Sequence, residues 1–158
     1  MMPGPSRAHQ EAVGEIYAQL RNHLRGKKCK AYIAPFDVRL FEREGDQPED
    51  VDTVVEPDVM VVCDASKVDE RGIKGAPDLI LEVLSPSTQS HDRVTKFSMY
   101  RRAGVWEYWL VDPESQVVQS FILQNGQYVA TASSGSDHLG VHVLEGCIID
   151  LGDVFPQE

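Results

Sequence analysis

The first apolar positions of the chain recur at the spacing of one face of a helix. Five residues form this stripe: Val13, Ile16, Tyr17, Leu20 and Leu24. Their intervals predict one amphipathic helix over about residues 8–25, ended by Gly26. An apolar stripe of this kind indicates packing on a core, so we assign no functional site to it.

Two stretches rich in β-branched residues follow and predict strands at about residues 29–41 and 53–63. Pro35 lies inside the first stretch and predicts a kink or a bulge, because proline cannot donate a hydrogen bond to a strand ladder. The charged residues 42–50 include a glycine and a proline, a composition typical of a hairpin loop. The pattern therefore predicts two neighbouring strands joined by a polar loop.

A nearly continuous apolar run at residues 78–84 predicts a third strand, buried on both faces of a sheet. The Ser-Pro-Ser-Thr sequence at residues 85–88 stops this strand and suits the start of a helix. A second helix is predicted over about residues 90–103, with Gly104 directly after its end. A further strand at residues 105–111 completes the order helix, three strands, helix, strand.

The remaining pattern indicates further β-structure. Asn125-Gly126 is a strong hairpin signal between strands predicted at about residues 116–123 and 128–132. The last predicted elements are a polar loop at residues 133–140 and one or two short strands around residues 141–144 and 147–151. The whole chain, residues 1–158, fits a single α/β (α+β) domain, and residues 1–6 are predicted to be a frayed end.

The chain is acidic, with a formal net charge of −10 from 25 acidic and 15 basic residues. Proteins that bind long duplex DNA normally carry a basic face, because contacts to phosphates dominate their affinity for DNA. This sequence has no basic run, and its one basic cluster, within residues 21–30, suits the end of the first helix. Any binding of nucleic acid is therefore expected to be local, metal-assisted or helped by a partner. No apolar segment has membrane-spanning length, so we expect a cytoplasmic protein with no membrane partner.

The three cysteines, Cys29, Cys63 and Cys147, are widely spaced among strand-like residues. An odd number at these spacings matches neither a disulfide framework nor a zinc motif. We therefore predict three buried thiols and no disulfide.

Glu82 is the unusual residue, because it interrupts the apolar run of the third strand. An ionised carboxylate buried without a partner costs several kcal/mol or becomes protonated, so a metal ion, a cation or a dense hydrogen-bond shell must lie nearby. Asp78 is four residues away on the same strand, roughly 13 Å at a rise of about 3.3 Å per residue, and is too far to share an ion. We assign Asp78 to backbone hydrogen bonding and Asp58, which an antiparallel return can bring beside Glu82, to the shared site. Two carboxylates with room for water suit Mg²⁺ or Mn²⁺ rather than zinc.

Asp92, Lys96 and Tyr100 recur every four residues on the second predicted helix and therefore share one face. In one interpretation Asp92 and Lys96 form a solvated surface pair. In the other, Lys96 points back over the end of the Glu82 strand, where its ammonium would orient an attacking water and neutralise charge on a phosphate. The spacing alone does not decide between them.

Several motifs spread over most of the chain belong together. They are Asp37-Val38-Arg39-Leu40, Glu56-Pro57-Asp58-Val59, the segment from Ala76 to Thr88 with its run Glu-Val-Leu-Ser-Pro-Ser-Thr, the set Asp92, Lys96 and Tyr100, and the segment from Gly104 to Pro113. Together they resemble the Uma-two family, bacterial proteins with a restriction-endonuclease-like core of the PD-(D/E)xK nuclease type. The resemblance implies this core, followed here by a C-terminal β-hairpin extension, and the predicted order of elements agrees with it.

The resemblance also implies a metal-dependent nuclease that hydrolyses phosphodiester bonds of nucleic acid by Mg²⁺-activated water. Asp58, Glu82 and the backbone carbonyl of Val83 would bind the Mg²⁺ or Mn²⁺, and Lys96 would be the catalytic lysine. The general nuclease motif has its lysine two residues after the glutamate, where this chain has Leu84. In this family the lysine is taken to have moved to the following helix.

Four further residues are candidates for supporting positions around the ion: Asp37, Asp92, Tyr100 and Glu107. Two other functions stay open. One is a non-catalytic module of the same fold that serves in binding or assembly, which the acidic charge and the displaced lysine favour. The other is an enzyme that uses the same site on a different phosphate or carboxylate substrate. A homodimer is an open alternative to a monomer.

Overall fold

The computed structural model describes residues 6–42, 45, 52–85 and 90–156. Helix α1 spans Arg7–Leu24 and is capped by Ser6, whose side chain accepts the N–H of His9 at 3.1 Å. The first predicted helix is thus confirmed, but Ser6 is its N-cap and not part of a frayed end; residues 1–5 lie outside the described residues. No helix in the described part of the chain is long and apolar enough to cross a membrane.

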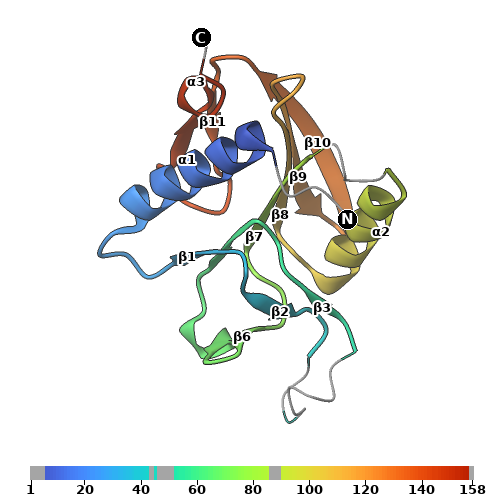
Figure 1. The fold of residues 1–158 in the computed structure, drawn as a ribbon. Coiled ribbons are helices and arrows are strands. Elements are labelled where there is room, and N and C mark those ends of the chain that lie inside the picture. Colours follow the sequence, from blue (N-terminus) through green and yellow to red (C-terminus); the bar gives the residue numbers. More distant parts are fainter. Residues whose placement is uncertain (1–5, 43–44, 46–51, 86–89, 157–158) are drawn as a thin grey trace.

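A six-stranded sheet in the order β1-β4-β7-β8-β9-β10 forms the centre of the molecule (Figure 1). Its strands are β1 Lys30–Ile33, β4 Val59–Val62, β7 Leu79–Val83, β8 Glu107–Asp112, β9 Val117–Gln124 and β10 Gln127–Ser134. Strands β7 and β8 are parallel, and helix α2, Ser90–Ala103, crosses between them, whereas the other neighbours are antiparallel. The predicted order of core elements and the Asn125-Gly126 hairpin are confirmed.

A second, four-stranded sheet in the order β3-β2-β6-β5 was not predicted. Its short strands are β2 Asp37–Arg39, β3 Val54–Val55, β5 Val68–Asp69 and β6 Gly72–Lys74, with a 3₁₀ helix η2, Ala65–Lys67, before β5. The predicted strands 29–41 and 53–63 are each divided between the two sheets, at the cis Ala34–Pro35 peptide and at Glu56-Pro57. Proline cannot continue a ladder, so each long pattern becomes two strands. Of the predicted loop 42–50, only residues 42 and 45 are described.

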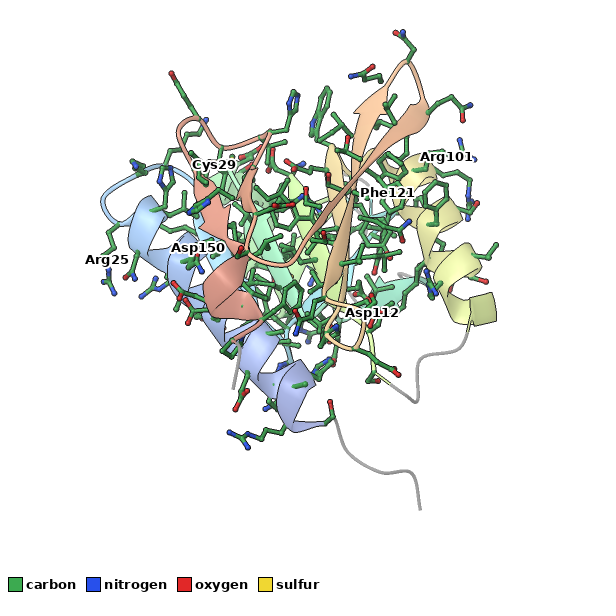
Figure 2. All side chains as sticks on the ribbon, turned by 90° about the horizontal axis from the view of Figure 1, so that it is seen from above. Arg25, Cys29, Arg101, Asp112, Phe121 and Asp150 are labelled. Carbon is green, nitrogen blue, oxygen red and sulfur yellow. A yellow bond between two sulfur atoms is a disulfide. The ribbon has the colours of Figure 1, made fainter. Side chains whose placement is uncertain are left out.

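Helices α1 and α2 cover opposite faces of the six-stranded sheet (Figure 2). Phe121 points toward α2, and Asp150 lies beside α1 on the other side (Figure 2). Side chains alternate along a strand, so Leu81 of β7 packs on the α1 side and Ile80 packs on the α2 side. By the same alternation, Glu82 belongs to the α2 side.

The C-terminal segment packs on the α1 side of the sheet. It comprises β11 His138–Gly140, β12 Ile148–Asp150 and α3 Leu151–Val154. Strands β11 and β12 pair with each other, so the predicted loop 133–140 contains a strand, and the predicted strand 141–144 is a turn. Residues 141–144 resemble a strand in sequence because Val141 and Leu144 are buried within the turn, which gives it an apolar pattern. Strand β11 was missed because it contains only three residues and depends on its pairing with β12.

Cys29 and Cys63 form a disulfide, and Cys147 is a buried free thiol. The prediction of three free thiols is therefore wrong for the first pair. Lys30 pairs with Val62 across β1 and β4, and the next pair along this register is Cys29 with Cys63. Two cysteines 34 residues apart meet only because of this strand pairing, which counting cysteines does not reveal.

Candidate active site

Strand pairing brings Asp58 and Glu82 together. In the antiparallel pair of β4 and β7, Val59 lies opposite Leu81, so the next position along the register sets Asp58 opposite Glu82. Glu82 belongs to the α2 face by the alternation along β7, whereas Asp58 lies in the bend directly before β4 and contacts His9 of α1. Asp58 and Glu82 nevertheless meet at the same end of the two strands. They line one cavity of about 230 Å³, which has room for several water molecules.

Asp58 is held by two neighbours. Its Oδ2 accepts the backbone N–H of Val83 at 2.7 Å and lies 3.4 Å from Nε2 of His9. His9, in the first turn of α1, is 7% exposed, and its Nδ1 has no hydrogen-bond partner within the described part of the chain. The position of the Asp58 carboxylate therefore depends on both β7 and α1.

Glu82 is buried and receives two hydrogen bonds from α2. Lys96 Nζ donates to its Oε2 at 2.7 Å, and the Tyr100 hydroxyl donates to its Oε1 at 3.3 Å. Burial raises the pKa of Glu82 from the usual 4.5 to about 7, and the neighbouring Asp58 charge also raises it. The Lys96 ammonium and the Tyr100 hydroxyl act in the opposite direction, because they stabilise the ionised carboxylate.

Helix α2 places Lys96 over the end of β7, as the second interpretation of the sequence required. Lys96 and Tyr100 are one turn apart, and aromatic packing fixes the helix: Phe97 and Tyr100 meet Phe121 and Tyr108 edge to face. The side chain of Asp92 lies outside the described residues, so the surface-pair interpretation is not decided by a contact of Asp92. The catalytic role of Lys96 stays a prediction.

A second pair of carboxyl groups lies at the rim of the cavity. Glu56 lines the cavity, and a hydrogen bond with Asp37 raises the pKa of Glu56. Asp37 begins β2, where the carbonyl of Asp37 approaches Gly72 so closely that a Cβ at position 72 would lie 2.0 Å from it. Asp37 does not line the cavity itself and is connected with it through the hydrogen bond to Glu56.

Two acids lie away from the cavity. Asp78 Oδ1 accepts the backbone N–H of Cys63 at 2.8 Å, the backbone role expected for Asp78. Glu107 is 1% exposed and accepts the Trp109 indole N–H at 2.7 Å and the Val143 backbone N–H at 3.0 Å. Since Trp109 packs on the α1 side, Glu107 faces away from Glu82 and is a structural acid rather than a support of the cavity.

The donor atoms suit a hard divalent ion. Within the described residues there is no cluster of three or more His, Cys, Asp or Glu side chains that could hold a metal ion, so any ion at this site would have to complete its coordination with water or a substrate. Asp58 and Glu82 supply two carboxylates at a cavity with room for water, and Mg²⁺ is commonly bound through one or two carboxylates with water filling the remaining positions.

Sequence reasoning did not place three residues that line the cavity: His9, Glu56 and Arg93. His9 meets Asp58 through the packing of α1 on the sheet, for which the sequence carries no local signal. Arg93, however, stands three residues before Lys96 on the same helix, and helical spacing applied to Lys96 would have found it.

The fold is that of a restriction-endonuclease-like protein. The crystal structure of a "putative nuclease belonging to DUF820" from Anabaena variabilis has the same fold, with a TM-score of 0.74 and 18% sequence identity over 97% of this chain and 83% of that one. Residues 1–152 match the Uma2 family, described as "Putative restriction endonuclease", and the chain belongs to this family. An uncharacterized protein of Synechocystis sp. is 28% identical over 140 residues, which are 87% of this chain and 70% of that protein. The family inferred from the motifs is thus confirmed.

Proposed function

We propose that this protein is a Mg²⁺- or Mn²⁺-dependent nuclease that hydrolyses phosphodiester bonds. The observation that carries the proposal is the meeting of Asp58, Glu82 and Lys96 at one cavity, with Lys96 Nζ 2.7 Å from Glu82 Oε2. Two acids can hold a divalent ion and a lysine can offset charge on a phosphate, and together these groups can catalyse phosphodiester hydrolysis.

The carboxylates of Asp58 and Glu82 and the backbone carbonyl of Val83 would hold the ion. When bound, Mg²⁺ supplies a coordinated water of lowered pKa and polarises the phosphate. The N–H of Val83 and the imidazole of His9 fix one oxygen of Asp58, which leaves its other oxygen for the ion. The Tyr100 hydroxyl orients Glu82 from the opposite side.

Lys96 has two tasks in this proposal. Its ammonium favours the ionised form of Glu82 and partly offsets the effect of burial on the pKa of this carboxyl. It also lies where it can donate to the attacking water and offset the charge that grows on the phosphate oxygens. The second task makes Lys96 a catalytic residue, whereas Tyr100 and His9 are positioning residues.

A non-catalytic module of the same fold is the second candidate. Two observations favour it. A net charge of −10 repels a polyanion such as nucleic acid. The ammonium of Lys96 is already paired with Glu82, which gives it a structural role without a substrate. In that function the Lys96–Glu82 pair neutralises a buried acid and stabilises the fold.

Two measurements on the wild-type protein separate these functions. Calorimetric titration with Mg²⁺ and with Mn²⁺ measures binding of the ion. Incubation with single- and double-stranded DNA and RNA shows whether any of these polymers is cleaved. We expect binding of the ion and cleavage of at least one of these polymers, both abolished in Asp58→Asn. Ion binding without cleavage of any polymer would favour the non-catalytic module, and absence of both would contradict the metal site itself.

A further inference from the structure

Arg93 is a partly buried arginine at the point where the candidate active site meets a second cavity. It lines the cavity of Asp58, Glu82 and Lys96 and also an adjoining cavity of about 380 Å³. Leu84 and Ser85, at the end of β7, line both cavities as well, so the two spaces are contiguous there.

Within the described part of the chain, the guanidinium of Arg93 has no protein partner. Among the described residues it makes no hydrogen bond, ion pair or ring contact, whereas Arg39 is paired with Glu42 and Asp69, and Arg101 donates to a backbone carbonyl. Arg93 also lines a mostly apolar groove with Phe97 and Phe121. An arginine that is partly buried in this way is usually paired, so its donors are available for an anion that the protein does not supply.

The charges around Arg93 limit what that anion can be. Lys96 is engaged with Glu82, so Arg93 is the cation of this cavity that is not paired within the described residues. Farther along the second cavity lie Asp112 and Glu114, which would repel additional phosphates. The arrangement therefore favours one phosphate group beside the candidate active site and disfavours a long run of phosphate contacts.

We propose that Arg93 binds a single non-scissile phosphate of the nucleic acid, next to the phosphate that is cleaved. The guanidinium matches a phosphate in a bidentate manner, which a lysine cannot do. This inference rests on the proposed nuclease function. It also explains how an acidic protein can hold a polyanion: one charged contact and the metal site would position the substrate, in place of a basic face.

The test starts from the polymer that the wild type cleaves, shortened to a fluorescein-labelled oligonucleotide of about eight nucleotides, a length within the usual range of single-strand sites. Binding is followed by fluorescence anisotropy in EDTA, so that the probe is not consumed. Arg93→Gln should weaken binding about 10- to 100-fold, the range for a charged hydrogen-bonded contact, and should raise KM more than it lowers kcat. The slope of log affinity against log salt should become shallower by about 0.7–0.9.

A double-mutant cycle ties the effect to one phosphate. Each phosphate of the probe is replaced in turn by a neutral methylphosphonate. One replacement should weaken the wild type as much as Arg93→Gln does and should have no effect on Arg93→Gln. Arg93→Lys should fall between the two proteins, and it serves as the test variant if Arg93→Gln does not fold. Arg102→Gln, an exposed arginine on the same helix, is the control for charge and should bind as the wild type does.

Three results would overturn the inference, and they differ from one another. Equal affinity of Arg93→Gln and the wild type would exclude the contact. If every methylphosphonate replacement weakened binding to Arg93→Gln as much as it weakens binding to the wild type, the lower affinity of Arg93→Gln would be a general effect of charge. A wild type that cleaves no nucleic acid would remove the proposed function and the Arg93 subsite with it.

Discussion

The carboxylate of Asp58 and the backbone N–H of Val83 are joined by a hydrogen bond of 2.7 Å between neighbouring strands. Val83 directly follows Glu82 in β7. The hydrogen bond that orients Asp58 is therefore donated by the residue next to Glu82. The backbone of β7 thus holds the Asp58 carboxylate beside Glu82, and His9 of α1 contacts the same Asp58 oxygen.

Glu82 should make the metal-free protein less stable as the pH rises. Its pKa is raised from 4.5 to about 7 by burial, so between these values the folded protein binds more protons than the unfolded chain. Its contribution is complete below 4.5 and is lost as the pH rises through about 7, a change on the order of 3 kcal/mol in the free energy of unfolding. Urea unfolding in EDTA over this range measures it. Glu82→Gln, which does not titrate, should flatten the dependence, and an unchanged pH slope in that variant would exclude Glu82 as its source.

Mg²⁺ should stabilise the protein through Asp58. At a concentration about 100 times the dissociation constant, an ion that binds only the folded state adds about 2.7 kcal/mol to the free energy of unfolding. Thermal unfolding with and without Mg²⁺ should show this gain in the wild type and not in Asp58→Asn. Asp78→Asn is the matched control, since Asp78 also follows a proline but bonds to Cys63, and it should keep the full Mg²⁺ effect.

Lys96→Met should reduce cleavage on the order of 10²–10³-fold, the effect of removing one charged group from a preorganised site. The variant should still fold, because Lys96 is 28% exposed and makes no part of the apolar core. Steady-state cleavage rates and a circular dichroism spectrum check the two statements. Lys28→Met, an exposed lysine after α1, should cleave at the wild-type rate. A Lys96→Met protein that cleaves as well as the wild type would return Lys96 to a purely electrostatic role beside Glu82.

His9→Ala should weaken Mg²⁺ binding about 10- to 100-fold, the range for residues that orient a metal ligand. The reason is the 3.4 Å approach of His9 Nε2 to Asp58 Oδ2. His9→Gln, whose amide can donate at the same place, should recover part of the affinity in a calorimetric titration. Equal affinities of His9→Ala and the wild type would mean that the N–H of Val83 alone positions Asp58.

Glu107→Ala should destabilise the fold without changing the Mg²⁺ effect. The change leaves the Trp109 indole N–H and the Val143 N–H buried without an acceptor, and each such group costs about 1–3 kcal/mol. Urea unfolding gives the loss, and the same titration with Mg²⁺ gives the second result. A weaker response to Mg²⁺ at unchanged stability would instead connect Glu107 with the cavity.

Much of the fold could be predicted because the helices and central strands carry local periodic patterns. The stripe of α1 and the apolar run around Glu82 are both read from neighbouring residues. The second sheet could not be predicted, since β3 and β5 contain two residues each and show no periodicity. The Cys29–Cys63 disulfide could not be predicted either, because it depends on the register between β1 and β4, which no local pattern specifies.

Within the candidate site, too, the residues with a local sequence signal could be predicted, and those placed only by tertiary packing could not. Asp58 and Glu82 could be assigned because a buried charge in an apolar run requires a partner on a neighbouring strand. Lys96 and Tyr100 followed from helical spacing. His9 could not be assigned, since its approach to Asp58 arises where α1 crosses the end of the sheet, and Glu107 could be recognised as buried but not as a partner of Val143.

The pairing of β4 with β7 makes the candidate site sensitive to chain length as well as to residue type. One residue inserted between Met60 and Val61 would keep every acid and the lysine, yet it would move Asp58 one position out of register with Glu82, because the pairing of β4 with β7 sets these two residues opposite each other. The same insertion beyond Asp112, in the turn before β9, lies outside all the segments that contribute the two acids and the lysine. Relatives that retain each of these residues could therefore lose the site through a single insertion or deletion within a strand, so strand length has to be compared along with residue identity.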